Sequence, residues 1–260
     1  MKAAAFDYAK PATLEEAFAL LAKPNAKVLA GGQSLIPSLN MRLSAPDLLV
    51  DISGLDLKQI ELKGQVLRIG ALVTHTELLN SKTVEKHVPL LAQAVPHVAH
   101  AAIRNRGTIG GSLVLADPAA EYPAVALALE AVLVVQSKTA ERRVEAAKFF
   151  KGLFDTDLRP GELLTAVEFP AVKPADKCAF LELTRRHGDY AIVGLARHNE
   201  RFVYFGVGGK PELFSFKDLK AAKEELTKNL NPSADLYNSA KAKLHLAGVL
   251  LERAWNATSH

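Results

Sequence analysis

The spacing of hydrophobic and polar residues predicts alternating strands and helices over the first fifty residues. Thr13-Leu14-Glu15-Glu16 has the form of a capping box and precedes apolar residues at helical spacing, which predicts a helix that ends before Pro24. Short apolar runs at 27–30 and 47–52 predict strands on either side of a second helix. Phe6-Asp7-Tyr8 fits a further strand at the edge of the sheet. This part of the chain is therefore expected to form a small layer in βαβ-like order.

The middle of the chain continues this alternation and contains a second capping box. Apolar runs predict strands at 65–70, 132–136 and 161–169. Thr74-His75-Thr76-Glu77 predicts the start of a helix. Asp117-Pro118 predicts another helix start, with a cap followed by proline at the first helical position.

The last part of the chain has a different order of elements. A polar, proline-containing stretch at 172–177 predicts a domain boundary. Beyond it, the pattern predicts three strands and then two amphipathic helices, at 179–184, 191–196, 202–207, 217–228 and 236–254. Strands followed by helices are typical of an α+β domain. We therefore predict three units, at residues 1–55, 56–173 and 174–260.

Composition and charge exclude several classes of protein. With 49% hydrophobic and 23% charged residues, the 260-residue chain has the composition of an ordinary folded protein. Its single cysteine, Cys178, excludes a disulfide framework, a multi-cysteine zinc site and an iron–sulfur cluster held by this chain alone, and it favours a cytoplasmic location. The net charge of +4 is spread along the chain, so nucleic acid is not an expected partner. The apolar runs are far shorter than the roughly 18 residues of a membrane span, so none is expected.

Two glycine pairs lie in turns between apolar segments. The first is Ala30-Gly31-Gly32-Gln33-Ser34, and the second is Thr108-Ile109-Gly110-Gly111-Ser112. Glycine permits positive φ and close approach of a ligand, and successive N–H groups in a turn bind anions. Two such loops with bare amides could hold a diphosphate, although each pair could instead make only a tight turn.

Polar residues near the second pair allow two interpretations. Asp117 and Glu121 are either a helix cap and a first-turn acid or acceptors for hydroxyl groups of a ligand. Arg185-Arg186-His187-Gly188-Asp189-Tyr190 joins two predicted strands, either as a plain polar hairpin or as a source of charge and an aromatic ring.

The sequence lacks the motifs of several common catalytic sites. It contains no GxGxxG after the first strand, no GxxxxGK[ST] and no GxSxG. Cys178 lies in an apolar strand and is expected to be a buried, inert thiol. His97 and His100 have no carboxylate or third histidine close in sequence, so no metal site is expected.

The order of the two glycine motifs, with Ile103-Arg104-Asn105-Arg106-Gly107 before the second and Asp117-Pro118 after it, closely resembles one family. It is similar to the FAD-binding medium subunit of molybdenum hydroxylases, such as carbon monoxide dehydrogenase and xanthine dehydrogenase type enzymes. The likeness covers nearly the whole chain and includes Phe149-Phe150-Lys151-Gly152, Gly161-Glu162-Leu163-Leu164 and Gly188-Asp189-Tyr190-Ala191. The resemblance implies an α+β fold with FAD between two subdomains, similar to vanillyl-alcohol oxidase (PCMH type). A C-terminal domain with a three-stranded antiparallel sheet and helices would follow.

The resemblance also implies FAD contacts at fourteen positions. The diphosphate would lie against the backbone of Ala30, Gly31, Gly32, Gln33, Ser34, Thr108, Ile109, Gly110 and Gly111. Ser112, Asp117 and Glu121 would lie along the ribityl and phosphate portion, Leu163 beside the ring edge, and Tyr190 over one face of the ring. Gln33 replaces a common histidine and Ser112 a common asparagine of the family, which leaves hydrogen bonding in place but can alter the redox tuning of the flavin.

By resemblance, the chain is an electron relay without a catalytic side chain of its own. In such a complex, a large molybdopterin subunit oxidises the substrate, and a small subunit with [2Fe–2S] clusters passes electrons to this FAD, which reduces a terminal acceptor. The three subunits would form a heterotrimer or a dimer of heterotrimers. The substrate and the acceptor are left open.

Two other functions stay open from the sequence. One is a self-sufficient FAD-dependent oxidase or reductase of the same fold, in which Tyr190 could serve a substrate pocket. The other is a scaffold subunit that has lost its flavin, against which the intact glycines argue.

Overall fold

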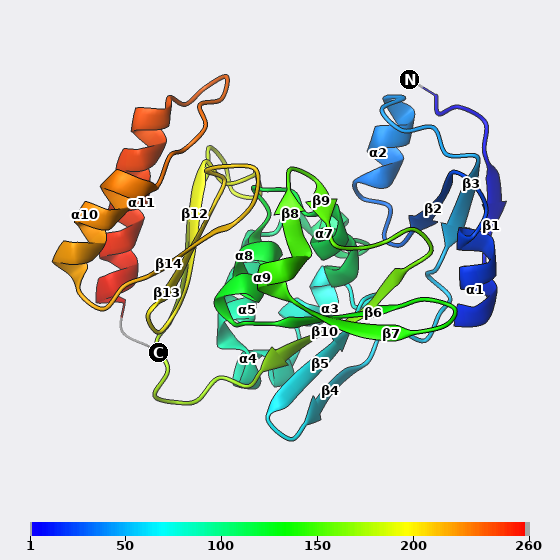
Figure 1. The fold of residues 1–260 in the computed structure, drawn as a ribbon, viewed down its shortest axis with the longest axis horizontal. Helices are drawn as coiled ribbons and strands as arrows, with labels where there is room; N and C mark the ends of the chain where they lie inside the picture. The colour runs from blue at the N-terminus through cyan, green and yellow to red at the C-terminus, as the bar shows by residue number, and fades with distance from the viewer. Residues whose placement is uncertain (1, 258–260) are drawn as a thin grey trace.

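The computed structural model describes residues 2–257 and places three sheets of three to five strands side by side (Figure 1). The N-terminal sheet is parallel, with the order β1-β3-β2 formed by β1 (Asp7–Ala9), β3 (Leu48–Asp51) and β2 (Ala26–Leu29). The helices α1 (Leu14–Leu21) and α2 (Leu35–Asn40) connect these strands. The predicted βαβ-like order is therefore confirmed.

The capping of α1 follows the predicted pattern in part. The Thr13 side chain accepts a hydrogen bond from the Glu16 amide at 3.2 Å. The Glu16 carboxylate accepts from the Ala12 amide, and not from that of Thr13. Phe18 on this helix packs with Leu48 and other residues of the first sheet in a small core.

The second sheet has five antiparallel strands in the order β4-β5-β10-β6-β7. They are β4 (Ile60–Lys63), β5 (Val66–Gly70), β10 (Leu163–Pro170), β6 (Val132–Gln136) and β7 (Glu141–Glu145). The three inner strands were predicted from their apolar runs. The two edge strands were not, because an edge strand is short and rich in charged residues, as in the β7 sequence ERRVE.

Short helices and a two-stranded ribbon pack around the second sheet. They are α3 (His75–Leu79), α4 (Lys82–His87), α5 (Pro89–Ala94), the 3-10 helix η1 (Val95–His97), α6 (Ala101–Arg104), α7 (Ile109–Leu115), α8 (Glu121–Ala128), α9 (Ala146–Phe149), β8 (Phe150–Gly152) and β9 (Asp155–Thr156). Every residue of α8 is buried, because this helix contacts α5 and α7 as well as strands of the C-terminal sheet.

The C-terminal sheet has four antiparallel strands, not the three that were expected. The order is β11-β12-β13-β14, formed by β11 (Cys178–Leu183), β12 (Val193–His198), β13 (Arg201–Phe205) and β14 (Glu212–Ser215). The additional strand β14 is a short edge strand whose burial alternates along ELFS. The helices α10 (Leu219–Asn229) and α11 (Ala240–Asn256) pack together and share an apolar core with this sheet.

The core continues from the second sheet into the C-terminal sheet. One buried cluster includes Leu67 and Phe169 of the second sheet together with Phe180 and Phe205 of the C-terminal sheet. The divisions expected at 55/56 and 173/174 fall between the sheets and stay predictions. Among the described residues, no helix has the length and apolar character that crossing a membrane would require.

Candidate functional site

The two glycine loops lie directly against each other. A Cβ atom at Gly31 would overlap the carbonyl group of Arg106 and would lie 2.9 Å from the Cα of Gly107. In the second loop, a Cβ at Gly110 would lie 2.6 Å from the carbonyl oxygen of Ala71. Both glycines are therefore required by close backbone approach. The approach joins the N-terminal sheet to the helices around the second sheet.

The first loop presents unpaired backbone amides. Gly32 has a φ of +73°, and its carbonyl oxygen accepts a hydrogen bond from the Ile36 amide. Within residues 2–257, the backbone N–H groups of Gly32, Gln33 and Ser34 have no acceptor. This loop therefore has the donors that an anionic group needs.

The second loop differs, because its amides are already used within the chain. The Ile109 amide donates to the Val73 carbonyl at 3.0 Å, and the Gly110 amide donates to the Ala71 carbonyl at 2.9 Å. The Gly111 amide donates to the Thr108 hydroxyl at 3.1 Å. The expectation of bare amides therefore holds for the first loop and is wrong for these positions of the second. These bonds instead fix the second loop beside the end of β5.

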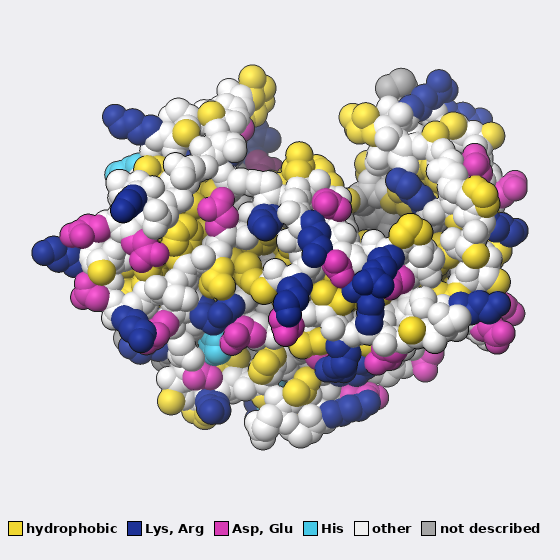
Figure 2. Space-filling view, in the orientation of Figure 1, with side chains coloured by type: hydrophobic (Ala, Val, Ile, Leu, Met, Phe, Trp, Pro, Cys, Tyr) yellow, Lys and Arg dark blue, Asp and Glu magenta, His cyan; other side chains and the backbone are white. Residues whose placement is uncertain are grey.

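A cleft of about 740 Å³ runs past both loops. Figure 2 shows the surface deeply hollowed between the lobe that carries α2 and the middle of the molecule. The cleft is lined by thirteen of the fourteen predicted cofactor residues: Ala30, Gly31, Gly32, Gln33, Ser34, Thr108, Gly110, Gly111, Ser112, Asp117, Glu121, Leu163 and Tyr190. The fourteenth, Ile109, does not line it, because its side chain is fully buried in the core. The volume is within the usual range of small-molecule and cofactor sites.

Asp117 and Glu121 form an acidic wall of the cleft. The Asp117 side chain accepts from the Ala119 amide at 2.9 Å in a turn that precedes α8, so the expectation that Asp117 caps this helix is wrong. Burial raises the pKa of Asp117. Burial also raises the pKa of Glu121 to about 7, and the Glu182 carboxylate nearby adds to this shift. Glu121 therefore changes charge near neutral pH.

Tyr190 lies at the mouth of the cleft, in the turn between β11 and β12. The residue is 62% exposed, and the Asp117 carboxylate lies near its hydroxyl group. Partial desolvation of this end of the side chain, with the Asp117 and Glu121 carboxylates, raises the pKa of Tyr190 to about 12. The phenol is therefore neutral at ordinary pH, and its ring is available to a ligand in the cleft.

A loop before β10, at residues 154–162, includes the two residues of β9. It also lines the cleft and was not fully anticipated. Arg142 of β7 anchors it, with contacts of 2.6 Å to the Asp157 carboxylate and 2.7 Å to the Glu162 carboxylate. Lys151 adds a contact of 3.0 Å to Asp157. The loop leads into Leu163, which is 3% exposed at the start of β10.

His75 is a cleft residue that the sequence did not identify as one. It is the first residue of α3, behind the capping box formed by Thr74 and Glu77. The residue is 5% exposed, and Nδ1 of its ring lies 3.0 Å from the hydroxyl oxygen of Tyr122. Burial, with the Arg104 charge, lowers the pKa of His75 to about 4, so the ring is neutral at pH 7. The sequence showed only the helix start, because Tyr122 is 47 positions away.

Two other candidates have structural roles. His97 forms an ion pair with Glu182, with Nδ1 3.2 Å from Oε1, and Glu182 raises the pKa of His97. Cys178 is buried, and burial raises the pKa of its thiol to about 11. The thiol is therefore protonated and unreactive near neutral pH.

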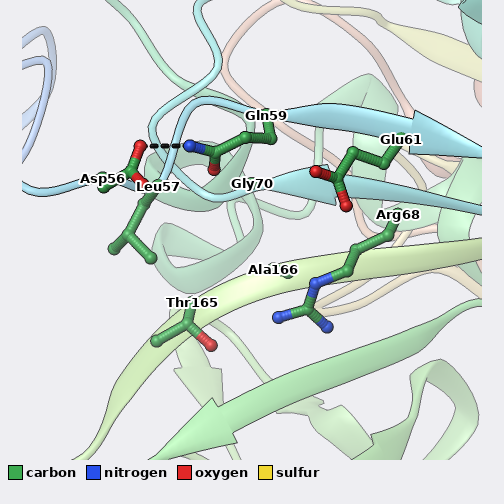
Figure 3. Close-up of a pocket in the computed structure, with 8 residues that line it drawn as sticks. All are labelled: Asp56, Leu57, Gln59, Glu61, Arg68, Gly70, Thr165 and Ala166. Atoms are coloured by element: carbon green, nitrogen blue, oxygen red, sulfur yellow. Dashed lines mark hydrogen bonds between the residues drawn. The ribbon is translucent and has the colours of Figure 1, made fainter.

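A second pocket, of about 90 Å³, lies at the second sheet (Figure 3). Asp56 and Gln59 hydrogen-bond at one end, and Glu61 and Arg68 lie at the other. Arg68 is already paired with Glu168 at 2.8 Å. This pocket is too small for a dinucleotide, and the guanidinium group of Arg68 is already engaged in its ion pair with Glu168.

The large cleft fits an extended dinucleotide. The unpaired amides of the first loop suit a diphosphate, and the acceptor Asp117 suits hydroxyl groups of a ligand. Tyr190 offers an aromatic face for a flat ring.

Comparison with known proteins agrees with this geometry. The family described as "FAD binding domain in molybdopterin dehydrogenase" matches residues 4–172. The chain is 37% identical to the 6-hydroxypseudooxynicotine dehydrogenase complex subunit alpha of Paenarthrobacter nicotinovorans, over 100% of this chain and 96% of the relative. Among solved structures, it matches a chain of carbon monoxide dehydrogenase from Hydrogenophaga pseudoflava with a TM-score of 0.93 and 32% identity, covering 99% of this chain and 98% of that one. A chain of quinoline 2-oxidoreductase from Pseudomonas putida 86 matches with a TM-score of 0.90 and 38% identity, covering 98% and 96%. The chain belongs to the family of FAD-binding domains of molybdopterin dehydrogenases.

Proposed function

We propose that this chain is the FAD-carrying electron-transfer subunit of a molybdopterin-containing hydroxylase or dehydrogenase. The observation that supports this function most directly is the meeting of the two glycine loops at one cleft of about 740 Å³. Relatives over nearly the full length of the chain are named as the medium subunit of nicotine 6-hydroxylase and the medium chain of carbon monoxide dehydrogenase.

The residues of the cleft have separate parts in holding the cofactor. The amides of Gly32, Gln33 and Ser34 would bind the diphosphate, and Gly110 and Gly111 of the second loop would lie beside it in the cleft. Ser112, Asp117 and Glu121 would bind polar groups along the ribityl and phosphate portion, and Leu163 would lie beside the ring edge. Tyr190 would cover one face of the ring and exclude water from it.

No catalytic side chain is assigned to this chain. When bound, FAD supplies the exchange between single-electron and two-electron transfer, and the protein positions it and tunes its surroundings. We propose that the partners are a large molybdopterin subunit and a small subunit with [2Fe–2S] clusters, as a heterotrimer or a dimer of heterotrimers. A cytoplasmic location agrees with the single, buried cysteine.

Anaerobic reduction of the FAD-loaded chain separates this function from a self-sufficient oxidase. The purified chain is mixed with aldehydes, N-heterocycles and purines, first alone and then with the partner subunits, and the visible absorption of the flavin is followed. A relay predicts bleaching only when the partners are present. Rapid bleaching of the isolated chain by an organic donor would contradict it.

A further inference from the structure

The ring of His75 is enclosed on one side by Tyr122 and opens to the cleft on the other. Nδ1 lies 3.0 Å from the Tyr122 hydroxyl, and a Cβ atom at Gly107 would lie 2.7 Å from Nε2. Among residues 2–257, no protein group hydrogen-bonds to Nε2, and the ring lines the cleft. Nε2 therefore has no partner among the described residues and lies beside Gly107, which also lines the cleft.

The hydrogen bond to Tyr122 fixes the tautomer of His75. Tyr122 is fully buried, and within the described residues its hydroxyl has the His75 Nδ1 atom as its only partner. If Nδ1 carried the hydrogen, the hydroxyl hydrogen of Tyr122 would be buried without an acceptor, which is costly. The hydroxyl therefore donates to Nδ1, and the hydrogen of the neutral ring resides on Nε2.

The position of Nε2 identifies which part of a dinucleotide it meets. Gly107, beside Nε2, is also the residue whose Cα lies against Gly31. Nε2 is therefore located where the two glycine loops meet, next to the loop with the unpaired amides. A donor at this point would lie beside the part of the ligand that the two loops hold, which is the diphosphate.

We propose that His75, locked in one tautomer by Tyr122, donates its Nε2–H to the diphosphate of the bound dinucleotide. This inference rests on the proposed function, because it takes FAD as the occupant of the cleft. The low pKa of His75 agrees with it, since the ring stays a neutral donor with a fixed hydrogen over the range in which FAD carries its full diphosphate charge.

The test compares three variants of the full chain with a matched control. His75→Leu removes the donor, and His75→Gln replaces Nε2–H with an amide N–H of similar reach. Tyr122→Phe keeps the His75 ring but removes the hydroxyl that fixes its tautomer. His245→Gln changes an exposed histidine of α11 in the same way and serves as the control. FAD affinity is measured by titration of the apoprotein, and only for variants that unfold cooperatively.

A hydrogen bond to a charged phosphate predicts that His75→Leu weakens FAD binding by roughly tenfold to a hundredfold. His75→Gln should recover part of this loss, Tyr122→Phe should show a smaller loss, and His245→Gln should bind like the unchanged protein. Equal affinity of a folded His75→Leu variant would overturn the inference while leaving FAD binding by the unchanged chain intact. Failure of the unchanged chain to bind FAD would instead overturn the proposed function.

Nitrogen-15 NMR of the unchanged chain supplies a readout that does not depend on folding of a variant. The hydrogen of His75 should be found on Nε2 in the apoprotein, and the Nε2 resonance should move when inorganic pyrophosphate or ADP is added. A hydrogen on Nδ1, or a resonance that responds to riboflavin but not to pyrophosphate, would contradict the assignment.

Discussion

Gly31 of the N-terminal loop lies against the backbone carbonyl of Arg106, close enough that any side chain at Gly31 would overlap it. The contact brings two loops that are 75 positions apart in the sequence to the same point of the cleft. A carbonyl in a short turn cannot swing away as a flexible side chain can, so the two loops depend on each other for their positions.

Gly31→Ala is therefore expected to force the loops apart and to weaken FAD binding by roughly a hundredfold or more, a loss of about 3 kcal/mol. The affinity is measured by titrating the apoprotein with FAD. Gly248→Ala in α11 is the matched control, because a Cβ there meets nothing within 4 Å. The control should keep its FAD affinity and gain stability of about 0.5–1 kcal/mol, as expected for Gly to Ala in a helix. Normal FAD binding by Gly31→Ala would show that the contact is dispensable.

Glu121 should make the apoprotein less stable as the pH rises. Its pKa is raised from 4.5 to about 7 in the folded chain, so between these values the folded state holds a proton that the unfolded state has lost. The free energy of unfolding should thus fall by an amount on the order of 3 kcal/mol from pH 4.5 to 7 because of this group. Glu121→Gln removes the effect. Denaturant unfolding at several pH values should show the variant gaining stability relative to the unchanged chain as the pH rises, and a constant difference would refute the assignment.

His75 should act in the opposite direction. Its pKa is lowered from 6.5 to about 4, so below pH 6.5 the unfolded state binds a proton that the folded state does not. Its contribution to the free energy of unfolding is present above pH 6.5 and is lost as the pH falls toward 4. In the same unfolding series, His75→Gln should gain stability relative to the unchanged chain on acidification. The Glu121 and His75 effects partly cancel between pH 4.5 and 6.5, so only the variants reveal them.

Arg142 should control how long the cofactor stays bound. The two carboxylates that it holds, Asp157 and Glu162, fix the loop at residues 154–162 along the cleft. Arg142→Leu should free this loop, speed FAD release several-fold and open the loop to proteases. Arg142→Lys should recover only part of the effect, since lysine cannot bind two carboxylates with a planar fork. Unchanged release and protease resistance in Arg142→Leu would show that the loop holds its position without these ion pairs.

Tyr190 should affect the flavin through its ring more than through its hydroxyl. Tyr190→Phe keeps the aromatic face and loses the interaction with Asp117, whereas Tyr190→Ala loses both. The alanine variant should raise the fluorescence of bound FAD and shift its reduction potential, because the flavin ring is then no longer covered and is open to water. The phenylalanine variant should resemble the unchanged chain. If phenylalanine and alanine gave the same change, the hydroxyl rather than the ring would be responsible.

The sequence predicted the parts of the fold that follow from local patterns. The capping box at Thr74 and the inner strands β5, β6 and β10 were expected, because apolar runs and cap residues are local signals. The edge strands β4, β7 and β14 were missed, since all three are short and charged residues interrupt the apolar pattern in β4 and β7. The assignment of Asp117 as a cap of α8 was wrong, because the N-cap of this helix is Ala120, three residues later. Asp117 instead closes the turn before the helix by accepting from the Ala119 amide.

The site was predictable only in so far as a motif marks it. The glycine loops, Asp117, Glu121, Leu163 and Tyr190 all come to one cleft. His75 and Arg142 were not found from the sequence, because their partners are distant: Tyr122 for His75, and Asp157 and Glu162 for Arg142. The hydrogen bond from the Gly110 amide to the Ala71 carbonyl was not expected either, because it joins two separate segments of the chain.

Titration of the purified apoprotein with FAD, with and without the Gly31→Ala change, tests the central claim most directly. Binding of one FAD per chain, with the visible absorption of an oxidised flavin and its loss in the folded Gly31→Ala variant, is the predicted result. A folded, unchanged chain that takes up no FAD, or a variant that binds it equally well, would contradict the assignment of the cleft between the two glycine loops as the FAD site.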